Sequence, residues 1–314
     1  MPTSTSRSSL YLLTPFEHLA VNFYYPRQMS LRVILLALTA CTASVTTESR
    51  VYDDRFEPTV LDIMRSDETA SANAPAVFYV HGGSWRGGSR GGEAGVVERL
   101  ARGGYVAVNV DYRLVPDGAF PSAVDDVFCA LAFVQTHADE LGIDPSRIAV
   151  MGYSAGGHLI GMLAAGNDVA ELQDASCPSG RATAPVAAIS AAGPMDLPTL
   201  STGSVVEEFV GVPFEEDPGR WALASPQTHV SGNEPPFLFI HAEHDLIVQV
   251  EQSQQMAAAL QDAGVSAELL KIEGGGHLLG DGAGLGQEQF EAPFDTPESA
   301  MAVFEFLHRT VGAP

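Results

Sequence analysis

Residues 152–156, which read Gly-Tyr-Ser-Ala-Gly, are the part of the chain whose types and spacing most clearly predict chemistry. The apolar run 147–152 leads into Ser154, and a helical pattern over 155–165 follows it. A sharp turn from a strand into a helix lifts a serine hydroxyl above a sheet, where it is accessible as a nucleophile. In another context the same residues would form a glycine-rich turn without chemistry, but the strand before and the helix after favour a nucleophilic Ser154.

A serine hydroxyl needs a neighbouring base, and the base needs an acid that orients it. His277 follows three glycines just past the apolar run 267–272, and Asp245 follows the apolar run 236–241. Both positions are expected at the carboxyl edge of a sheet, in the chain order serine, acid, histidine that accompanies this kind of turn. We therefore predict that Ser154, Asp245 and His277 form a catalytic triad.

Other acids and histidines compete for these roles. Glu243 lies close to the predicted acid, whereas Asp217 and Asp281 follow no matching strand. His158 lies one helical turn after the serine and is expected to pack or hydrogen-bond as a structural residue. Three further histidines stand at different strand ends without the spacing of metal ligands, so the sequence predicts no metal site: they are His81, His241 and His244.

A second motif, residues 81–85 with the sequence His-Gly-Gly-Ser-Trp, directly follows the apolar run 76–80. Backbone N–H groups in such a turn can stabilise the negative charge that develops on a carbonyl oxygen. Gly82 and Gly83 allow the chain to turn tightly enough to aim these donors. The N–H of Ala155, directly after the nucleophile, is expected to add another donor.

The elements that must position these residues alternate between strand-like and helical patterns from residue 51 onward. This alternation predicts an α/β protein with a mostly parallel central sheet flanked by helices. The expected strands are 60–64, 76–80, 105–110, 147–152, 186–190, 236–241 and 267–272, and the expected helices are 122–141, 155–165 and 297–309.

Residues 193–235 interrupt the alternation, because they are rich in Pro, Gly and acidic residues and contain only short apolar patches. An insertion at this point projects over the carboxyl ends of the strands, where ligands bind in α/β sheets. We therefore expect a small lid or pocket wall. The residues expected to contact a substrate are Gly82, Trp85, Tyr153, Phe209, Phe214 and Trp221, although packing of the lid onto the sheet would also occupy such aromatic side chains.

Charge excludes some partners. Sixteen Lys and Arg residues face 39 Asp and Glu residues, which gives this chain of 314 residues a formal net charge of −23. Such a charge repels the phosphate backbone of nucleic acids and anionic lipid surfaces. We interpret it as a surface suited to solubility, with the steering of cationic substrates as the weaker alternative.

The three cysteines, Cys41, Cys129 and Cys177, give neither a disulfide framework nor a metal-binding spacing. Cys129 falls in an apolar helical pattern and is interpreted as a small core residue. A bridge between Cys129 and Cys177 stays open for the case that the protein is exported.

Residues 29–41 resemble an export signal, because Arg32 precedes an apolar run, 33–40, that is too short to span a bilayer. Residues 38–41, Leu-Thr-Ala-Cys, resemble the lipobox of bacterial lipoproteins, in which the cysteine is acylated and becomes the mature N-terminus. An ordinary cleaved signal is the alternative. We expect export, with a lipid anchor at Cys41 and a periplasmic or cell-surface location, or otherwise secretion.

The expected organisation follows from this signal. Residues 1–28 are expected to be a non-native or disordered leader outside the fold, and residues 42–50 a polar tether. Residues 51–314 are expected to form one domain with its lid at about 193–235.

As a set, the motifs resemble those of bacterial esterases with the α/β-hydrolase fold, over roughly residues 58–311. The resemblance is strongest to the branch with carboxylesterases, feruloyl-esterase-like enzymes and arylformamidases, and next to hormone-sensitive-lipase-type esterases. It rests on residues 81–85, Asp111-Tyr-Arg-Leu114, Phe120-Pro121 with Asp126, residues 152–157, Ala224-Ser-Pro226, Asp245 and His277. The resemblance implies no cofactor, and it implies that Gly83 and Ser84 donate to the oxyanion. Ser84 departs from the family, which often has a third glycine there.

Three classes of function compete. The first is a serine esterase acting on short-chain acyl or aryl esters, and the second is an arylformamidase or another amide-type hydrolase with the same triad. Fold and triad do not separate these two, because specificity depends on the pocket. The third, a non-catalytic binding protein, is disfavoured by the complete set of catalytic residues. Because six prolines interrupt residues 193–235, we expect no long lipase-type lid helix and no interfacial activation.

Overall fold

A computed structural model describes residues 43–57, 59–67, 69, 72–200, 203–279, 294 and 296–314. The chain divides into a unit of residues 1–39 and a unit of residues 40–314, and all described residues belong to the second. The expected leader, the expected signal with Cys41, and Asp281 lie outside the described residues.

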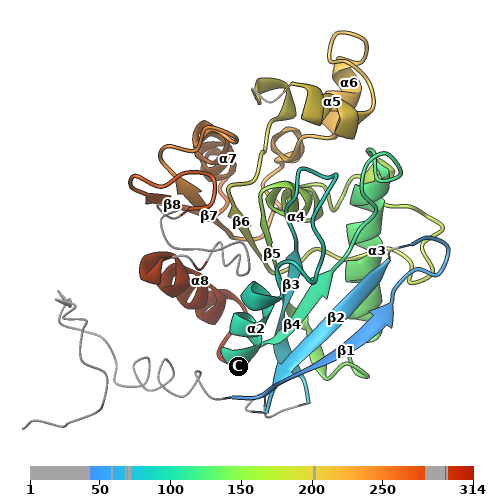
Figure 1. The fold of residues 1–314 in the computed structure, drawn as a ribbon, viewed down its shortest axis with the longest axis vertical. Helices are drawn as coiled ribbons and strands as arrows, with labels where there is room; N and C mark the ends of the chain where they lie inside the picture. The colour runs from blue at the N-terminus through green and yellow to red at the C-terminus, as the bar shows by residue number, and fades with distance from the viewer. Residues whose placement is uncertain are drawn as a thin grey trace, which may run out of the picture. The chain divides into compact units, whose positions relative to one another are not determined.

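The described residues form one eight-stranded sheet with the order β1-β2-β4-β3-β5-β6-β7-β8 (Figure 1). Strands β1 and β2 run antiparallel to their neighbours, while β4, β3, β5, β6, β7 and β8 are parallel. The expectation of a mostly parallel sheet is confirmed. The strands are β1 (Val45–Val51), β2 (Val60–Ser66), β3 (Ala74–Val80), β4 (Val106–Val110), β5 (Ile143–Tyr153), β6 (Ala187–Ala191), β7 (Phe237–Ala242) and β8 (Ala267–Ile272).

Strand β1 corrects the expectation that residues 42–50 are a tether. It pairs with β2 along its whole length, from Val45 opposite Ser66 to Val51 opposite Val60. Its Thr and Val residues suit an extended strand, and a polar strand is tolerated at a sheet edge because one side and both faces can meet water. The folded domain therefore includes residues that the polar sequence assigned to a linker.

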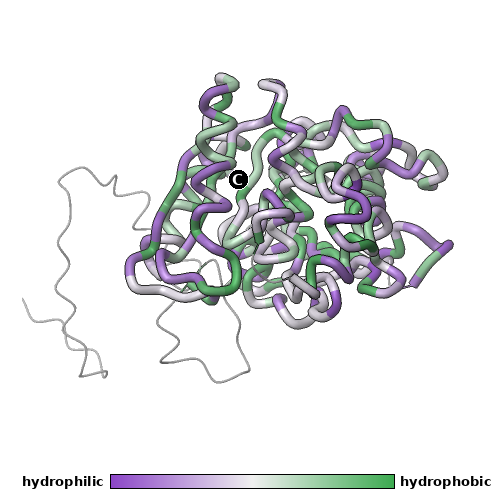
Figure 2. The backbone as a smooth tube through the Cα atoms, turned by 90° about the horizontal axis from the view of Figure 1, so that it is seen from above, coloured by the Kyte–Doolittle hydropathy of each residue, from purple (hydrophilic) through white to green (hydrophobic). Residues whose placement is uncertain are grey.

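The central strands are buried on both faces. All seven residues of β3 are buried, and successive side chains point to opposite sides of the sheet. Phe78 and Val80 belong to one hydrophobic cluster, and Val77 and Tyr79 belong to the other. Two layers of helices must therefore cover this sheet. In contrast to these buried strands, peripheral helices and loops carry hydrophilic stretches, which Figure 2 shows in purple.

Helices supply both covering layers. Residues of α2 (Ala94–Arg102) and α8 (Pro297–Thr310) enter one hydrophobic cluster, and residues of α3 (Ser122–Thr136), α4 (Ala155–Ala165) and α7 (Glu251–Asp262) enter the other. Helix α3 ends at Thr136 rather than at the expected Leu141, because the chain continues as turns that lead to Gly142 with a φ of 57°. Among the helices of the described residues, none combines the length and the apolar character that a bilayer span requires.

The expected lid, residues 193–235, consists of short elements. They are η2 (Leu197–Thr199), α5 (Ser204–Val210), α6 (Pro218–Leu223) and η3 (Pro226–His229). Figure 1 shows α5 and α6 next to each other, beyond one edge of the sheet. Short helices separated by prolines fit the expected absence of a long lid helix in this described part. We call residues 193–235 the cap.

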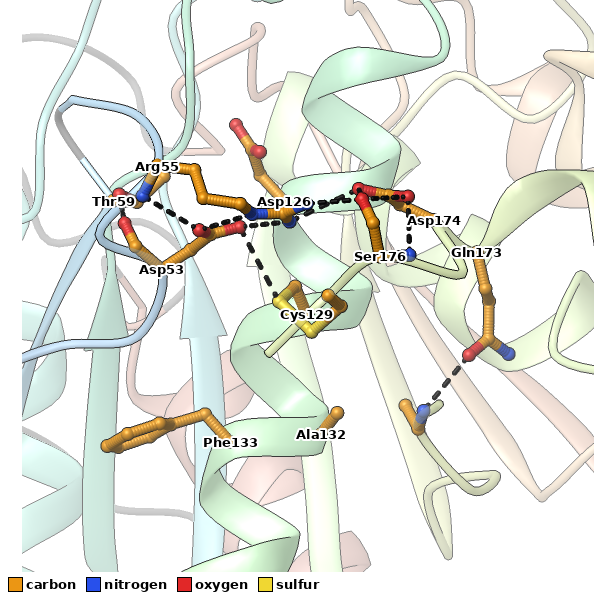
Figure 3. The surroundings of a disulfide bond; sticks show 12 residues. Asp53, Arg55, Thr59, Asp126, Cys129, Ala132, Phe133, Gln173, Asp174 and Ser176 are labelled. Carbon is orange, nitrogen blue, oxygen red and sulfur yellow. Dashed lines mark hydrogen bonds and ion pairs between the residues drawn. A yellow bond between two sulfur atoms is a disulfide. The ribbon is translucent and has the colours of Figure 1, made fainter. Parts of the chain in front are cut away.

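A disulfide joins Cys129 of α3 to Cys177, with 5.7 Å between their Cα atoms (Figure 3). Cys129 is also a buried core residue, so the packing role and the bridge that was left open both occur. Next to the bridge, the Arg55 guanidinium pairs with Asp53 at 2.5 Å and with Asp174 at 3.1 Å. The loop that carries Cys177 is therefore attached to α3 by a covalent bond and to Arg55 by the ion pair of Asp174.

Candidate active site

Ser154 stands in a sharp turn between β5 and α4. Its φ of 52° and ψ of −119° are unusual for a residue with a side chain, and its N–H donates to the Ala191 carbonyl at 2.8 Å. A Cβ added to Gly156 would lie 2.0 Å from the Val80 carbonyl oxygen, so only glycine permits this approach of α4 to β3. The sequence around the serine thus forms the strained strand-to-helix turn that its motif predicts.

The structure brings the three expected residues together. The Ser154 Oγ lies 2.9 Å from His277 Nε2, and His277 Nδ1 lies 2.7 Å from Asp245 Oδ2. Ser154 and Asp245 are 8% and 4% exposed, and the His277 side chain is 13% exposed. These distances fit a nucleophile bonded to a base and a base bonded to an orienting carboxylate.

Parallel strands explain why residues so far apart in sequence meet. Ser154 follows β5, Asp245 follows β7 and His277 follows β8. Since these strands run in the same direction, their carboxyl ends lie at one edge of the sheet. Tyr153 supports the arrangement, because its hydroxyl donates to the His277 carbonyl at 2.7 Å.

Asp245 is held by several donors. Its Oδ1 accepts the N–H groups of Ile247 and Val248, both at 2.9 Å, and His241 Nε2 lies 3.3 Å from its Oδ2. Burial by itself raises the pKa of the Asp245 carboxyl, but hydrogen bonds from His241, His277 and the Val248 backbone lower the pKa far more. Asp245 is therefore ionised and fixed, as an orienting carboxylate must be.

The competing acids have other partners. Glu243 is partly exposed and pairs with Lys271, with 3.4 Å between Oε1 and Nζ. Asp217 caps α6 by accepting the backbone N–H of Arg220 at 2.9 Å. Neither carboxylate is hydrogen-bonded to His277 in the described part of the chain.

His158 is structural, as expected. It is fully buried, and its Nε2 donates to the Ala224 carbonyl at 2.8 Å while its Nδ1 accepts the indole N–H of Trp85 at 3.2 Å. Burial lowers the pKa of His158 to about 4, with the bond to Ala224 opposing this effect. The imidazole is thus neutral, and it links α4 to the cap.

Residues 82–84 form the turn that the sequence assigns to an oxyanion hole. In the described part of the chain, no acceptor pairs with the backbone N–H of Gly83, Ser84 or Ala155. Ser84 has a φ of 57°, a conformation that favours glycine, so the serine keeps the tight turn in place of a third glycine. The three amides remain available for an oxygen atom of a substrate.

A cavity of about 340 Å³ lies against the nucleophile. Its walls include the expected residues Gly82, Gly83, Ser84 and Tyr153, together with Ser154 and His277. Further lining residues, which the sequence analysis missed, are Gly88, Ser89, Gly92, Glu93 and Leu278. Most of the residues that line this cavity are small, with four glycines and three serines among them.

The four other aromatic side chains expected to contact a substrate do not line this cavity, and the structure gives them other contacts. Trp85 is 3% exposed and stacks on Phe209, with 4.4 Å between ring centroids. Trp221 is 6% exposed, and its indole N–H donates to the Val212 carbonyl at 2.9 Å. Phe214 is 40% exposed and packs edge-on against Trp221. These rings instead join the cap to the domain or pack within it.

Glu93 is the charged residue that the sequence analysis missed. It precedes α2 and is 8% exposed, and its carboxylate accepts the Tyr79 hydroxyl at 2.5 Å and the Gly82 N–H at 2.9 Å. Burial raises the pKa of Glu93 to about 7, although both hydrogen bonds lower it. A glutamate just before a helix normally indicates a solvated helix end, so no local signal reveals this burial.

The chain is similar to known proteins in sequence and in fold. Esterase LipC of Mycobacterium tuberculosis is 33% identical over 227 residues, which are 69% of this chain and 56% of LipC. The chain therefore spans little more than half the length of that relative. The esterase Est2 of Thermogutta terrifontis superposes with a TM-score of 0.68 at 25% identity, and the alignment covers 84% of this chain and 92% of Est2.

A truncated carbohydrate esterase from gut microbiota superposes with a TM-score of 0.74 at 22% identity, over 86% of this chain and 97% of that protein. At this identity the likeness shows the fold alone. The BD-FAE family model matches residues 61–260, which is more than half of the chain. The chain therefore belongs to the BD-FAE family and has the α/β-hydrolase fold.

Proposed function

We propose that this protein is a serine hydrolase that cleaves carboxylic esters. The observation that carries the proposal is the continuous hydrogen-bonded series from Ser154 Oγ through His277 to Asp245. The similarity to LipC and Est2, which are both called esterases, supports the same reaction. The expected partner is a small-molecule ester, and the negative charge of the chain disfavours nucleic acid.

In the first half of the reaction, the Ser154 Oγ attacks the ester carbonyl carbon and its proton passes to His277 Nε2. Asp245 stabilises the imidazolium that forms, and it keeps the ring in the orientation that the 2.7 Å bond defines. The negative carbonyl oxygen is stabilised by the free amides of Gly83, Ser84 and Ala155. His277 then gives the proton to the alcohol oxygen, the C–O bond breaks, and an acyl-Ser154 remains.

In the second half, water attacks the acyl carbonyl and passes a proton to His277 Nε2. The tetrahedral intermediate collapses, the carboxylic acid leaves, and the proton returns to the Ser154 Oγ. The two steps use the same base and the same amide donors. The attacking water supplies the proton that returns to the Ser154 Oγ, so the protons balance over the two steps.

Substitution of Ser154 tests the reaction. In S154A the attacking oxygen is absent, so we expect kcat on p-nitrophenyl acetate to fall on the order of 10⁶-fold while the circular dichroism spectrum is unchanged. Phenylmethylsulfonyl fluoride should label Ser154 in the native protein. Labelling of a different serine, with turnover retained in S154A, contradicts the proposal.

We propose short acyl groups or small aryl groups as the natural ester substituents. The cavity of about 340 Å³ and the short helices of the cap support this size range. Turnover of p-nitrophenyl esters should be highest from acetate to hexanoate and should fall for longer chains. A rise toward palmitate, or a jump when the substrate forms an emulsion, argues for a lipase; faster turnover of N-formylkynurenine argues for an arylformamidase.

We also propose that the protein is exported and anchored through Cys41. The lipobox-like residues 38–41 support an anchor, and the Cys129–Cys177 disulfide supports an oxidising compartment. In a bacterial host the full chain should partition into the membrane fraction, and C41S should release it or block its processing. Recovery of the intact chain, with reduced Cys129 and Cys177, from the cytosol contradicts this proposal.

A further inference from the structure

Glu93 is a buried carboxylate at the cavity that the reaction sequence above does not use. It lines the same cavity as Ser154 and His277. Among the described residues, its hydrogen bonds go to Tyr79 and Gly82 and not to the nucleophile or the base. We therefore assign it no proton transfer, and its effect on the reaction must pass through the groups that it holds.

Both carboxylate oxygens of Glu93 have a donor. Oε2 accepts the hydroxyl of Tyr79, a fully buried residue of β3, at 2.5 Å. Oε1 accepts the backbone N–H of Gly82 at 2.9 Å. When Glu93 is ionised, these bonds are about twice as strong as bonds to a neutral acceptor, and burial strengthens them further. Glu93 thus ties the start of the oxyanion turn to the interior of the sheet.

Polar contacts hold each of the two peptide groups that flank the Gly82 Cα. In the His81–Gly82 peptide, the carbonyl of His81 accepts the Tyr112 hydroxyl at 3.1 Å and the N–H of Gly82 donates to Glu93. In the Gly82–Gly83 peptide, the carbonyl of Gly82 lies 2.7 Å from His81 Nδ1. Because a trans peptide is planar, its N–H points away from its carbonyl. Fixing the Gly82 carbonyl therefore fixes the direction of the free Gly83 N–H.

Close packing makes this turn sensitive to displacement. A Cβ added to Gly82 would lie 2.9 Å from the Tyr153 carbonyl oxygen, so Gly82 lies directly against the turn that carries the nucleophile. Loss of its N–H acceptor would leave a buried donor unpaired, which favours a rotated peptide. Because the two peptides share the Gly82 Cα, a shift of the His81–Gly82 peptide would strain the contact of the Gly82 carbonyl with His81 Nδ1, and that contact sets the direction of the Gly83 N–H.

We propose that Glu93 is a positioning residue that sets the orientation of the oxyanion-binding amides through the N–H of Gly82. The inference rests on the proposed esterase function. Donors to the oxyanion act on the transition state more than on the bound ester, so the loss of correct orientation lowers kcat and leaves KM nearly unchanged. A role in stability alone would lower the unfolding temperature without this selective loss of kcat.

Three variants of Glu93 and one control test the proposal on p-nitrophenyl acetate. E93L removes the acceptor without leaving a buried charge, and we expect kcat to fall about 10–100-fold with KM within about twofold. E93Q keeps an amide oxygen for the Gly82 N–H, so most of the lost activity should return. E93D, whose side chain is one methylene shorter, should resemble E93L and replaces it if E93L does not fold. E98Q changes an exposed glutamate of α2 that pairs with Arg102 and is the matched control.

The outcomes separate this inference from the proposed function. The pattern of low kcat in E93L and E93D, intermediate to high kcat in E93Q and wild-type kcat in E98Q supports Glu93 as a positioning residue. Folded E93L and E93D with wild-type kcat overturn the Glu93 inference alone, and so does a loss in E93Q as large as in E93L. A wild-type protein without Ser154-dependent ester hydrolysis overturns the proposed function and this inference together.

Discussion

The carboxyl edge of the sheet and the cap, residues 193–235, relate to the candidate site in opposite ways. At the sheet edge, the turns after β5, β7 and β8 bring Ser154, Asp245 and His277 into direct hydrogen-bond contact. In the cap, the large aromatic residues expected to face a substrate do not line the cavity. Phe209 is fully buried and Trp221 is 6% exposed.

The difference comes from what fixes a side chain in each region. At the sheet edge, the position of a residue is set by strand direction and by a short turn, so the order of elements is enough to bring three residues together. In the cap, short helices leave the direction of each ring to local packing, and an aromatic ring gains more from full burial than from exposure at a cavity wall. A residue at the right place along the chain therefore need not point into the cavity.

Among the variants that compare these two regions, the largest effect should come from Asp245, the acid at the carboxyl edge of the sheet. D245N keeps the shape of the side chain but removes the charge that stabilises the His277 imidazolium, so kcat should fall by up to about 10⁴-fold, or about 5 kcal/mol of barrier. E243Q is the matched control, because Glu243 lies two residues away and pairs with Lys271 on the surface. Its kcat should stay within about twofold of wild type in the p-nitrophenyl acetate assay. Near-normal turnover in D245N with a loss in E243Q would reverse the assignment.

The cap should respond in stability rather than in substrate binding. F209A removes a ring that stacks on Trp85 at 4.4 Å and lies 5.3 Å from the His158 ring, and it leaves a cavity in the core. We expect a loss of about 3–5 kcal/mol in the free energy of unfolding, measured with urea. F214A removes a ring that is 40% exposed and should cost less than about 1 kcal/mol.

The same pair of variants tests the position of the cap rings relative to the substrate. Since Phe214 does not line the cavity beside Ser154, F214A should leave KM for p-nitrophenyl acetate unchanged. A large rise of KM in F214A, with normal stability, would indicate that the cap aromatics contact the substrate. The difference inferred between the two regions would then be wrong.

The sequence predicts the fold and the meeting of the three residues for a physical reason. Buried strands such as β3 and β4 are largely apolar runs. Glycine is required at 152 and 156, because a Cβ atom there would lie only 2.4 Å and 2.0 Å, respectively, from a backbone carbonyl oxygen. Both features depend on local sequence. Strand β1 was missed because an edge strand carries no apolar pattern, and pairing with β2 decides its conformation.

The remaining differences between the prediction and the structure concern which side chains are buried. Trp85 directly follows the oxyanion turn and has a φ of 57°, yet its side chain packs against His158 and Phe209. Glu93 lies before a helix, yet Tyr79 and Gly82 enclose its carboxylate. Neither direction follows from spacing, because each depends on neighbours from another element.

The smallest of the three effects concerns Glu93, a titratable carboxyl group that is buried at the carboxyl edge of the sheet. Among the described residues of the cap, no Asp or Glu is buried. Burial raises the pKa of Glu93 from its ordinary value of 4.5 to about 7 in the folded protein. Between these two values the unfolded chain binds fewer protons at this residue than the folded protein does. Stability must therefore fall as the pH rises through this interval, by up to about 3 kcal/mol, and the loss is complete above about pH 7.

E93Q cannot titrate, so the free energy of unfolding of this variant should lack that part of the pH dependence. Asp125, whose pKa is also raised to about 7, first by burial and then by Asp174 and Asp126, contributes equally to both proteins and cancels in the comparison. Urea unfolding of wild type and E93Q from pH 4.5 to 8 should therefore give a difference that shifts in favour of E93Q as the pH rises, by up to about 3 kcal/mol. Two parallel curves would mean that Glu93 ionises as easily in the folded protein as in the unfolded chain, and that its burial beside the active site costs no stability.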